Sequence, residues 1–271
     1  MVRKRIIPGI LIAVFLFLFI DIEISLHWLC TEEYEIKDAA LPAAFDGFKI
    51  AQVSDLHNAV FGKNNSRLIK KVSDAQPDII ALTGDIVDEN TKDFDAVTAL
   101  IKELSAIAPC YYVTGNHEAW IYKDYIPFEK SASEFALFLH NSSEKIERDG
   151  EFIRIQGLDD PNYLYTFGDS VKKLSAEDGY KILLSHRPER FEDYVERRFN
   201  LVLSGHTHGG QVRLPVIGAV VAPTQRFFPK YVSGLYSEGV TNMIVSDGLG
   251  TSVLPVRLNN PPEIVVIELT R

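Results

Sequence analysis

Five short polar blocks constrain the fold of this chain more than any other feature, because each directly follows a run of apolar residues. Together they contain five of the seven histidines, accompanied by Asp, Asn and Gly. The blocks are Asp55-Leu56-His57, Gly84-Asp85-Ile86-Val87-Asp88, Gly115-Asn116-His117-Glu118, Ser185-His186 and Gly205-His206-Thr207-His208. Short apolar runs that end at turn residues predict buried strands.

The predicted strands cover residues 49–54, 78–83, 110–114, 181–185 and 200–204, and helical patterns cover residues 66–75, 94–106 and 188–199. Buried strands that alternate with helices predict a layered α/β fold. In open α/β sheets, ligands bind beyond the carboxyl ends of the strands. We therefore expect all five blocks to lie on one rim of one sheet.

The side chains in these blocks are those that bind divalent metals. Asp and neutral His combine hard oxygen with borderline nitrogen, which suits Mn, Fe, Zn or Co better than calcium. Gly205, Gly209 and Gly210 predict an irregular loop from which His206 and His208 reach one site. Neither cysteine belongs to a block, which excludes a Cys-rich structural zinc site.

The residue types favour a two-metal centre over a single ion. Two ions about 3.5–4 Å apart need a shared ligand, and a carboxylate on a central strand is the usual one. Asp85 is the expected bridge. A hydroxide held between the ions would be the nucleophile, since coordination lowers the pKa of water to about 7.

The order of the blocks resembles that of the calcineurin-like metallophosphoesterases, from about Phe45 to the C-terminus. The family signature is Asp-x-His, Gly-Asp-x-x-Asp, Gly-Asn-His-Glu or Asp, a lone His, and Gly-His-x-His, and all five parts are intact. The resemblance implies one metal held by Asp55, His57, Asp85 and His208, and a second held by Asp85, Asn116, His186 and His206. It also implies that His117 meets the phosphate and protonates or stabilises the leaving group.

The same resemblance implies a four-layer α/β/β/α sandwich of two mixed sheets flanked by helices. Residues 151–156, 211–214, 242–246 and 263–270 have strand patterns that can supply the second sheet. The run Gly205–Gln211 is similar to a bacterial branch that carries an N-terminal membrane segment. Members of that branch share no single substrate, and some act on lipid-linked sugar nucleotides.

For four further polar residues, a structural role has to be weighed against a functional one. Asp88 is expected to support its loop by hydrogen bonds, and Glu118 either orients His117 or a ligand, or is solvated. Arg187 is expected to form a surface salt bridge, with a phosphate clamp as the alternative. His140 follows an amphipathic stretch and is expected at a helix end.

The net charge limits the partners. The chain carries −9; residues 1–30 carry +1, which leaves −10 on the rest. Nonspecific binding of nucleic acid depends on cationic side chains that neutralise phosphates, so nucleic acid is an unlikely partner. Phosphate must then be recognised locally through the metals, and small or lipid-borne phosphate esters and pyrophosphates stay open as substrates.

The N-terminus is the second informative region. Residues 6–20 are almost wholly apolar and follow three basic residues, which fits either a cleaved signal or an uncleaved anchor. We favour an uncleaved anchor, because no Ala-x-Ala site follows promptly and the apolar character resumes through Leu29. The anchor then comprises residues 1–29, a tether comprises residues 30–44, and the catalytic domain comprises residues 45–271. Fifteen helical residues reach only about 22 Å, so a crossing needs the whole segment. The basic flank then places the catalytic domain outside the cytoplasm.

The sequence therefore predicts a membrane-anchored, metal-dependent phosphoesterase. The alternatives are a non-catalytic metal-binding scaffold of the cell envelope, an enzyme specific for a lipid-linked or nucleotide-sugar pyrophosphate, and a hydrolase of non-phosphate esters. The complete ligand set and His117 favour turnover over the scaffold.

Overall fold

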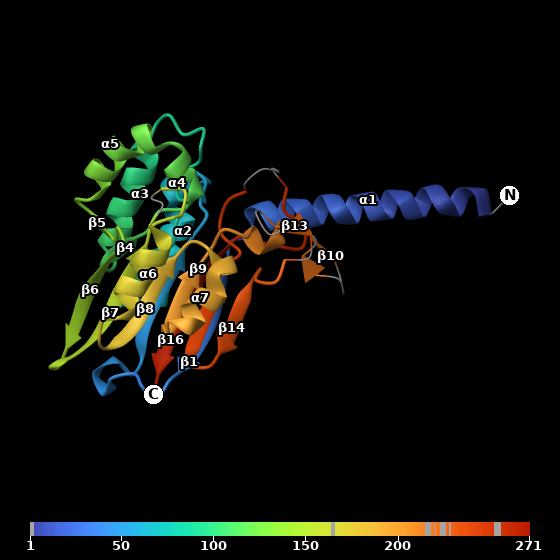
Figure 1. Ribbon diagram of the computed structural model, residues 1–271. Coiled ribbons are helices and arrows are strands. Elements are labelled where there is room, and N and C mark those ends of the chain that lie inside the picture. The colour runs from blue at the N-terminus through green and yellow to red at the C-terminus, as the bar shows by residue number, and fades with distance from the viewer. Residues whose placement is uncertain are drawn as a thin grey trace.

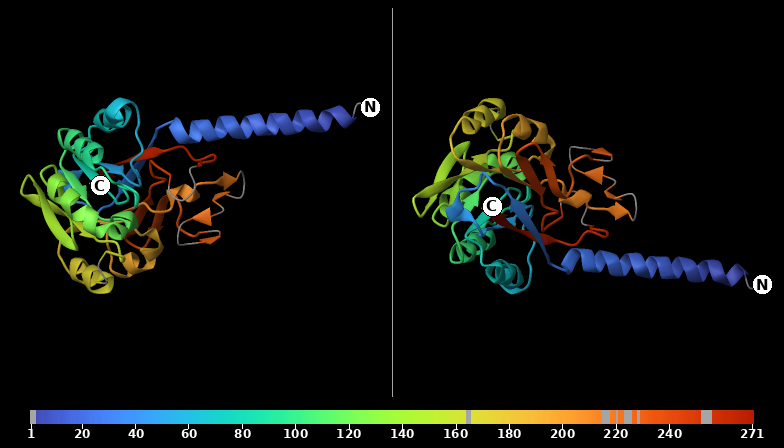
Figure 2. Two further views of the ribbon diagram at one scale, coloured as in Figure 1. Left: turned by 90° about the horizontal axis from the view of Figure 1, so that it is seen from above. Right: turned by 90° about the horizontal axis from the view of Figure 1, so that it is seen from below.

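Two six-stranded sheets pack face to face, with helices on the outer face of each (Figures 1 and 2). The computed structural model describes residues 3–163, 166–214, 218–219, 221–222, 226–227, 229–251 and 256–271. The predicted four-layer α/β/β/α sandwich is confirmed.

The first sheet has the strand order β1-β16-β2-β3-β4-β5. Strands β2 to β5 are parallel, β16 runs antiparallel to β2, and β1 is parallel to β16. In sheet order, the strands are β1 (Cys30–Lys37), β16 (Glu263–Thr270), β2 (Phe48–Val53), β3 (Ile79–Leu82), β4 (Cys110–Tyr112) and β5 (Ala136–Phe138).

The second sheet has the order β14-β15-β9-β8-β7-β6. Its four central strands are parallel, and the strand at each edge is antiparallel to its neighbour. In sheet order, the strands are β14 (Gly234–Glu238), β15 (Thr241–Val245), β9 (Leu201–Ser204), β8 (Tyr180–Ser185), β7 (Glu151–Leu158) and β6 (Ser142–Arg148).

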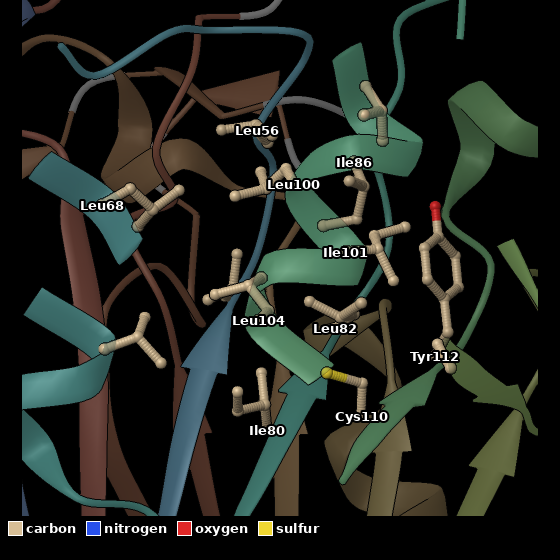
Figure 3. Packing of buried hydrophobic residues seen from close by; sticks show 14 of the residues in the cluster. Leu56, Leu68, Ile80, Leu82, Ile86, Leu100, Ile101, Leu104, Cys110 and Tyr112 are labelled. Atoms are coloured by element: carbon tan, nitrogen blue, oxygen red, sulfur yellow. The ribbon is translucent and has the colours of Figure 1, made fainter. Parts of the chain in front are cut away.

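Helices α2 (Ser66–Ala75), α3 (Asp95–Ser105) and α5 (Tyr122–Ala132) cover the first sheet, and α6 (Phe167–Ser175) and α7 (Phe191–Glu196) cover the second (Figure 2). Three hydrophobic clusters fill the three spaces between the layers. Figure 3 shows the outer cluster of the first sheet, where Leu100 and Leu104 of α3 lie over Ile80 and Leu82 of β3.

The strands are apolar throughout because both faces of each sheet are covered. On β3, Ile80 and Leu82 belong to the helix-facing cluster, whereas Ile79 and Ala81 belong to the cluster between the sheets. Successive side chains of a strand point to opposite faces, so a strand buried on both sides reads as a continuous apolar run.

The remaining elements are short. The 3₁₀ turns are η1 (Ala43–Phe45), η2 (Lys63–Asn65), η3 (Pro188–Arg190) and η4 (His208–Gly210), and α4 (Asn116–Trp120) is a single turn and a half. Two small hairpins join β10 (Arg213–Leu214) to β11 (Gly218–Ala219) and β12 (Val221–Ala222) to β13 (Arg226–Phe227).

Two expectations about topology are wrong. The five blocks do not share one sheet: β2, β3 and β4 belong to the first, and β8 and β9 to the second. The predicted strand 263–270 forms β16 of the first sheet, and the predicted strand 211–214 shrinks to β10 of a separate hairpin. Strand patterns report burial, not which sheet a strand joins.

The segment predicted as a tether, residues 30–44, contains β1 and η1. All eight residues of β1 pair with β16, from Cys30 opposite Glu263 to Lys37 opposite Thr270. Ile36 of β1 is buried in the cluster between the sheets. The first sheet therefore begins before residue 45, as an edge strand.

Helix α1 (Arg3–His27) projects away from the body of the molecule (Figures 1 and 2). Its apolar side chains at Ile12, Phe15, Phe17 and Ile20 are each more than half exposed. Within the part of the chain that the structure describes, no helix has both the length and the apolar character needed to span a bilayer.

Candidate metal centre

The carboxyl ends of five strands, three from the first sheet and two from the second, meet at one place. The residues predicted to bind metal or to act in catalysis are all buried, and each lies within the first few residues after a strand. Asp55 and His57 follow β2, Asp85 follows β3, Asn116 and His117 follow β4, His186 follows β8, and His206 and His208 follow β9.

The backbone of this region adopts conformations that non-glycine residues seldom take. Left-handed φ angles occur at Asp55 (51°), His57 (45°), Asp85 (51°), His206 (73°) and His208 (49°). Such strain costs on the order of 1–3 kcal/mol per residue and persists only where the surroundings impose it. These turns direct side chains from neighbouring positions into a common space.

Asp55, His57 and His208 form one group of potential ligand atoms, all within 4.8 Å of one another. The Nε2 atoms of His57 and His208 are 3.1 Å apart, and Nε2 of His208 is 3.4 Å from Oδ1 of Asp55. Nδ1 of His208 lies 3.3 Å from the Gly250 carbonyl oxygen, to which it donates when protonated. That tautomer leaves the lone pair of Nε2 facing the group.

Asp85, His186 and His206 form a second group. Nε2 of His186 lies 3.1 Å from Oδ2 of Asp85 and 3.2 Å from Nδ1 of His206. Nδ1 of His186 is 2.8 Å from the carbonyl oxygen of Thr83, which again leaves Nε2 available as the ligand atom.

Asp85 lies between the two groups. Its Oδ2 is 3.1 Å from Nε2 of His186 in the second group and 3.7 Å from Nε2 of His57 in the first. Its Oδ1 accepts a hydrogen bond of 2.9 Å from the backbone N–H of His117, which fixes the carboxylate plane. One carboxylate therefore reaches both groups.

The residues fit divalent cations. Oδ1 of Asn116 is buried without a hydrogen-bond partner among the described residues, and an amide oxygen in that position is a ready metal ligand. In each group, ring nitrogens and carboxylate oxygens lie within 4.8 Å of one another, close enough to share one cation. The site is built from N and O donors, which suit Mn, Fe, Zn or Co.

Electrostatics favour the protonation state that a metal ligand needs at some of these residues and oppose it at others. Burial opposes ionisation of Asp85, but the charges of His186, His57 and His117 hold its pKa well below the ordinary value. Burial, reinforced by Arg187, lowers the pKa of His206 well below its usual range, and burial and His57 do the same for His208. Asp85 is thus ionised and the imidazoles of His206 and His208 are neutral. Burial raises the pKa of Asp55, and the Asp85 carboxylate, acting against burial, raises the pKa of His186 to about 10, so a metal must displace protons from these two groups.

His117 lies beside His57 of the first group and belongs to neither of the two groups described above. Its Nδ1 accepts a hydrogen bond of 3.0 Å from the backbone N–H of Glu89, so the neutral ring carries its proton on Nε2. Its ring is 4.5 Å from that of His57 and 4.7 Å from that of Trp120, centroid to centroid. Burial lowers the pKa of His117.

Asp88 supports its loop as expected, because its Oδ1 accepts hydrogen bonds from the backbone and side chain of Asn90. Its Oδ2 also lies 3.6 Å from Nδ1 of His57 and 3.4 Å from Nδ1 of His117. His57, Asp88 and His117 thus make a third close group, which the sequence patterns did not predict.

Glu118 is a positioning residue, not a solvated carboxylate. It is fully buried and accepts hydrogen bonds from the backbone N–H groups of Asp85 (2.9 Å), Ile86 (2.9 Å) and Gly115 (2.8 Å), and from the Tyr112 hydroxyl (2.8 Å). Burial raises the pKa of Glu118 to about 7. A Glu at the third position of a helix that accepts from its N-cap is the sequence signal for this role.

Arg187 does not form the expected surface salt bridge. It is buried, its Nε and Nη2 donate to the carboxylate of Asp160, and its Nη1 lies 2.8 Å from Nε2 of His206. Asp160 lies outside every block, so no local pattern indicated this pair.

Two glycines allow the loops to approach one another closely. A Cβ at Gly115 would collide with the carboxylate of Asp85, and one at Gly205 would collide with the side chains of Ser54 and Asp55. Any side chain at Gly115 or Gly205 would therefore displace Asp85 or Asp55 from its place in the site.

His140 is not at a helix end. The stretch before it forms β5, and its imidazole bridges two carboxylates, with Nδ1 2.8 Å from Asp159 and Nε2 2.8 Å from Glu129.

A model of the calcineurin-like phosphoesterase family matches residues 48–210. The uncharacterized metallophosphoesterase YkuE of Bacillus subtilis (strain 168) is 33% identical over 257 residues, which span 90% of this chain and 86% of that protein. The phosphodiesterase YaeI of Escherichia coli (strain K12) is 29% identical over 243 residues, spanning 86% and 84% respectively. Among solved structures, TT1561 of Thermus thermophilus has the same fold, with a TM-score of 0.51 and 17% identity over 75% of this chain and 90% of that one.

Proposed function

Because this chain belongs to the calcineurin-like phosphoesterase family and is a metallophosphoesterase, we propose that it hydrolyses phosphate-ester or pyrophosphate bonds with two divalent ions. The observation that carries the proposal is the position of Asp85, whose Oδ2 reaches His186 at 3.1 Å and His57 at 3.7 Å. A carboxylate between two ligand groups is the usual bridge of a two-metal site.

In this proposal, one ion is held by Asp55, His57, Asp85 and His208, and the other is held by Asp85, Asn116, His186 and His206. Bound divalent ions supply a nucleophile by lowering the pKa of a coordinated water to about 7, and they neutralise charge on the phosphoryl oxygens. The ion type follows availability among Mn, Fe, Zn and Co more than ligand preference.

His117 is the proposed catalytic side chain. With Nδ1 committed to the Glu89 N–H, the Nε2–H of the neutral ring can donate a hydrogen bond to the oxygen that leaves phosphorus and stabilise the charge that develops on it. The Asp85 carboxylate holds the His117 backbone N–H at 2.9 Å, so the ring is fixed relative to the bridging ligand. Orientation of this kind is what a hydrogen-bond donor to a developing negative charge requires.

The direct test is hydrolysis of bis-p-nitrophenyl phosphate by the purified full chain loaded with Mn²⁺, with metal content measured in parallel. We expect turnover that depends on Mn²⁺ and two ions per chain. A chain that binds two ions and hydrolyses no phosphate substrate would favour the envelope scaffold instead. A chain that takes up no transition metal would contradict the proposed site.

The substrate class extends the same proposal. We favour small or lipid-linked phosphate esters and pyrophosphates over nucleic acid, because the net charge of −9 repels a polyanion. Parallel assays with nucleotide sugars, phospholipids and undecaprenyl phosphates distinguish these substrates. Preferred hydrolysis of a polynucleotide would contradict the preference.

We also propose that α1 attaches the protein to a membrane, with the catalytic domain outside the cytoplasm, as in the bacterial branch that the Gly205–Gln211 run resembles. The support is the row of exposed apolar side chains on the projecting helix, including Phe15, Phe17 and Phe19. Flotation with lipid vesicles tests the attachment, and a variant with Ser at these three positions should stay with the soluble fraction. Equal flotation of both proteins would contradict it.

A further inference from the structure

Residues 257–260, which lie shortly before β16, pack directly against the loops of the candidate metal site. Arg257 is buried, and its guanidinium donates to the carbonyl oxygens of Gly250 (2.6 Å), Gly248 (3.1 Å) and Asn260 (2.9 Å). The Gly250 carbonyl is also the acceptor beside Nδ1 of His208, at 3.3 Å. Arg257 therefore fixes the group that orients the His208 ring.

Asn260 holds the main chain of the same histidine. Its side chain is fully buried, and its Nδ2 donates to the carbonyl oxygen of His208 at 2.6 Å. His208 has a left-handed φ of 49°. A residue in that conformation keeps it only while its neighbours impose it, and Asn260 is such a neighbour.

The end of helix α1 is attached to this same segment. The backbone N–H of Asn259 donates to Oδ2 of Asp21 at 2.7 Å, and that of Asn260 donates to Oγ of Ser25 at 3.3 Å. Ser25 is only 1% exposed, so this part of α1 is packed into the body although the rest of the helix projects from it. Two hydrogen bonds thus fix the loop that carries Asn260.

We propose that the last turns of α1 are a working part of the metal site: Asp21 and Ser25 hold the Asn259–Asn260 loop, and Asn260 positions His208. The inference rests on the proposed function, since it concerns the ion assigned to Asp55, His57 and His208. The N-terminal helix is then more than an attachment, because removing it would release the loop that holds a ligand in place. Asp21, Ser25 and Asn260 are positioning residues.

The alternative hypothesis is that Asp21 and Ser25 have a purely structural role. If Asp21 and Ser25 serve only to attach α1, their loss lowers the unfolding temperature and leaves metal affinity unchanged. If they position His208, their loss weakens the ion that His208 binds and not the other, because Asn260 holds the main chain of His208.

The test uses full-length Asn260→Ala and the double variant Asp21→Ala/Ser25→Ala, with Glu23→Ala as the matched control on the same helix. Glu23 is exposed, and its Oε2 lies 3.7 Å from Nε2 of His27, one turn further along α1. Mn²⁺ binding is measured by equilibrium dialysis, and amide hydrogen exchange at residues 207–210 is measured on the metal-free proteins.

We expect Asn260→Ala to weaken one of two binding steps by about 10-fold or more, the usual effect of losing a group that orients a ligand. The double variant should weaken the same step by less, and both should exchange faster at residues 207–210. Glu23→Ala should match the wild type in each measurement.

Wild-type binding and wild-type exchange in both variants would overturn the inference. So would equal weakening of both binding steps, since that reports a general loss of structure. If the wild type binds no ion, the proposed function fails on its own, and the exchange measurement still decides whether α1 orders the His208 loop.

Discussion

Asp85 is the residue on which both ligand groups depend. Its Oδ2 is the atom that lies near a histidine of each group, and its Oδ1 is occupied by the His117 N–H. We expect Asp85→Asn to lose both ions, because the substitution removes the charge that the surrounding imidazoles stabilise. Elemental analysis of the purified variant measures this. Two ions and full turnover would rule out the bridge.

His117 separates catalysis from metal binding. Its Nδ1 accepts from the Glu89 backbone, and its Nε2 is not among the atoms that form the two ligand groups. We expect His117→Ala to lower kcat by about 10²–10³-fold, the range for losing a donor to a developing negative charge, with metal content kept near two per chain. Loss of a full equivalent of metal in this variant would assign His117 as a ligand.

His140 makes stability depend on pH. Burial alone would lower its pKa, but hydrogen bonds to Asp159 and Glu129 raise the pKa of His140 to about 10. Tyr163 covers the ring, with centroids 5.6 Å apart. Because the folded pKa exceeds the unfolded value, the contribution is complete below about pH 6.5 and is lost as pH rises through about 10.

The measurement is the difference in unfolding free energy between the wild type and His140→Gln. We expect a larger difference at about pH 6 than at about pH 10. Groups that titrate equally in both proteins cancel in the comparison. An equal difference at both values of pH would mean that the imidazolium gains nothing from its two carboxylates.

The types of the ligand residues and their order could be predicted from the sequence, whereas the residues that hold the ligands in place could not. His206 and His208 stand in one block, so their proximity is local. Arg187 meets His206 while held by Asp160, 27 residues earlier, and Asn260 meets His208 across 52 residues. Contacts between residues so far apart in the chain follow from the fold, and no short pattern records them.

Among the elements, the strands and helices nearest the site follow their sequence patterns closely. Helix α2 has the predicted bounds, and β9 differs from its prediction by one residue. The assignment of strands to sheets did not follow, because β16 and β15 have similar apolar patterns and join different sheets. Burial on both faces removes the alternation that would tell one sheet from the other.

The packing of strand β1 leads to a prediction about the stability of the protein. Ile36 is 2% exposed and packs in the cluster between the sheets, although sequence reasoning placed it in a tether. We expect Ile36→Ala to lower the unfolding free energy by about 2–5 kcal/mol, as for other buried aliphatic truncations. Urea unfolding measures the change, with the exposed Glu33→Ala on the same strand as control. A tether would respond equally to both substitutions.

For the whole molecule, the site lies where the two sheets end together. Asp55, His57, Asp85 and Asn116 come from the first sheet, and His186, His206 and His208 come from the second. Each proposed ion therefore has ligands from both sheets. Helix α1 joins the same region through Asp21 and Ser25.

This arrangement links metal binding to global stability. An ion that binds the folded chain and not the unfolded one stabilises it by about 2.7 kcal/mol at a free concentration 100 times its Kd. We expect EDTA to lower the unfolding temperature and Mn²⁺ to restore it, with a shift that grows with the logarithm of the free ion concentration. Asp85→Asn should show neither shift, because it holds no ion. If neither EDTA nor Mn²⁺ changed the unfolding temperature of the wild type, the two sheets would not be joined through a metal.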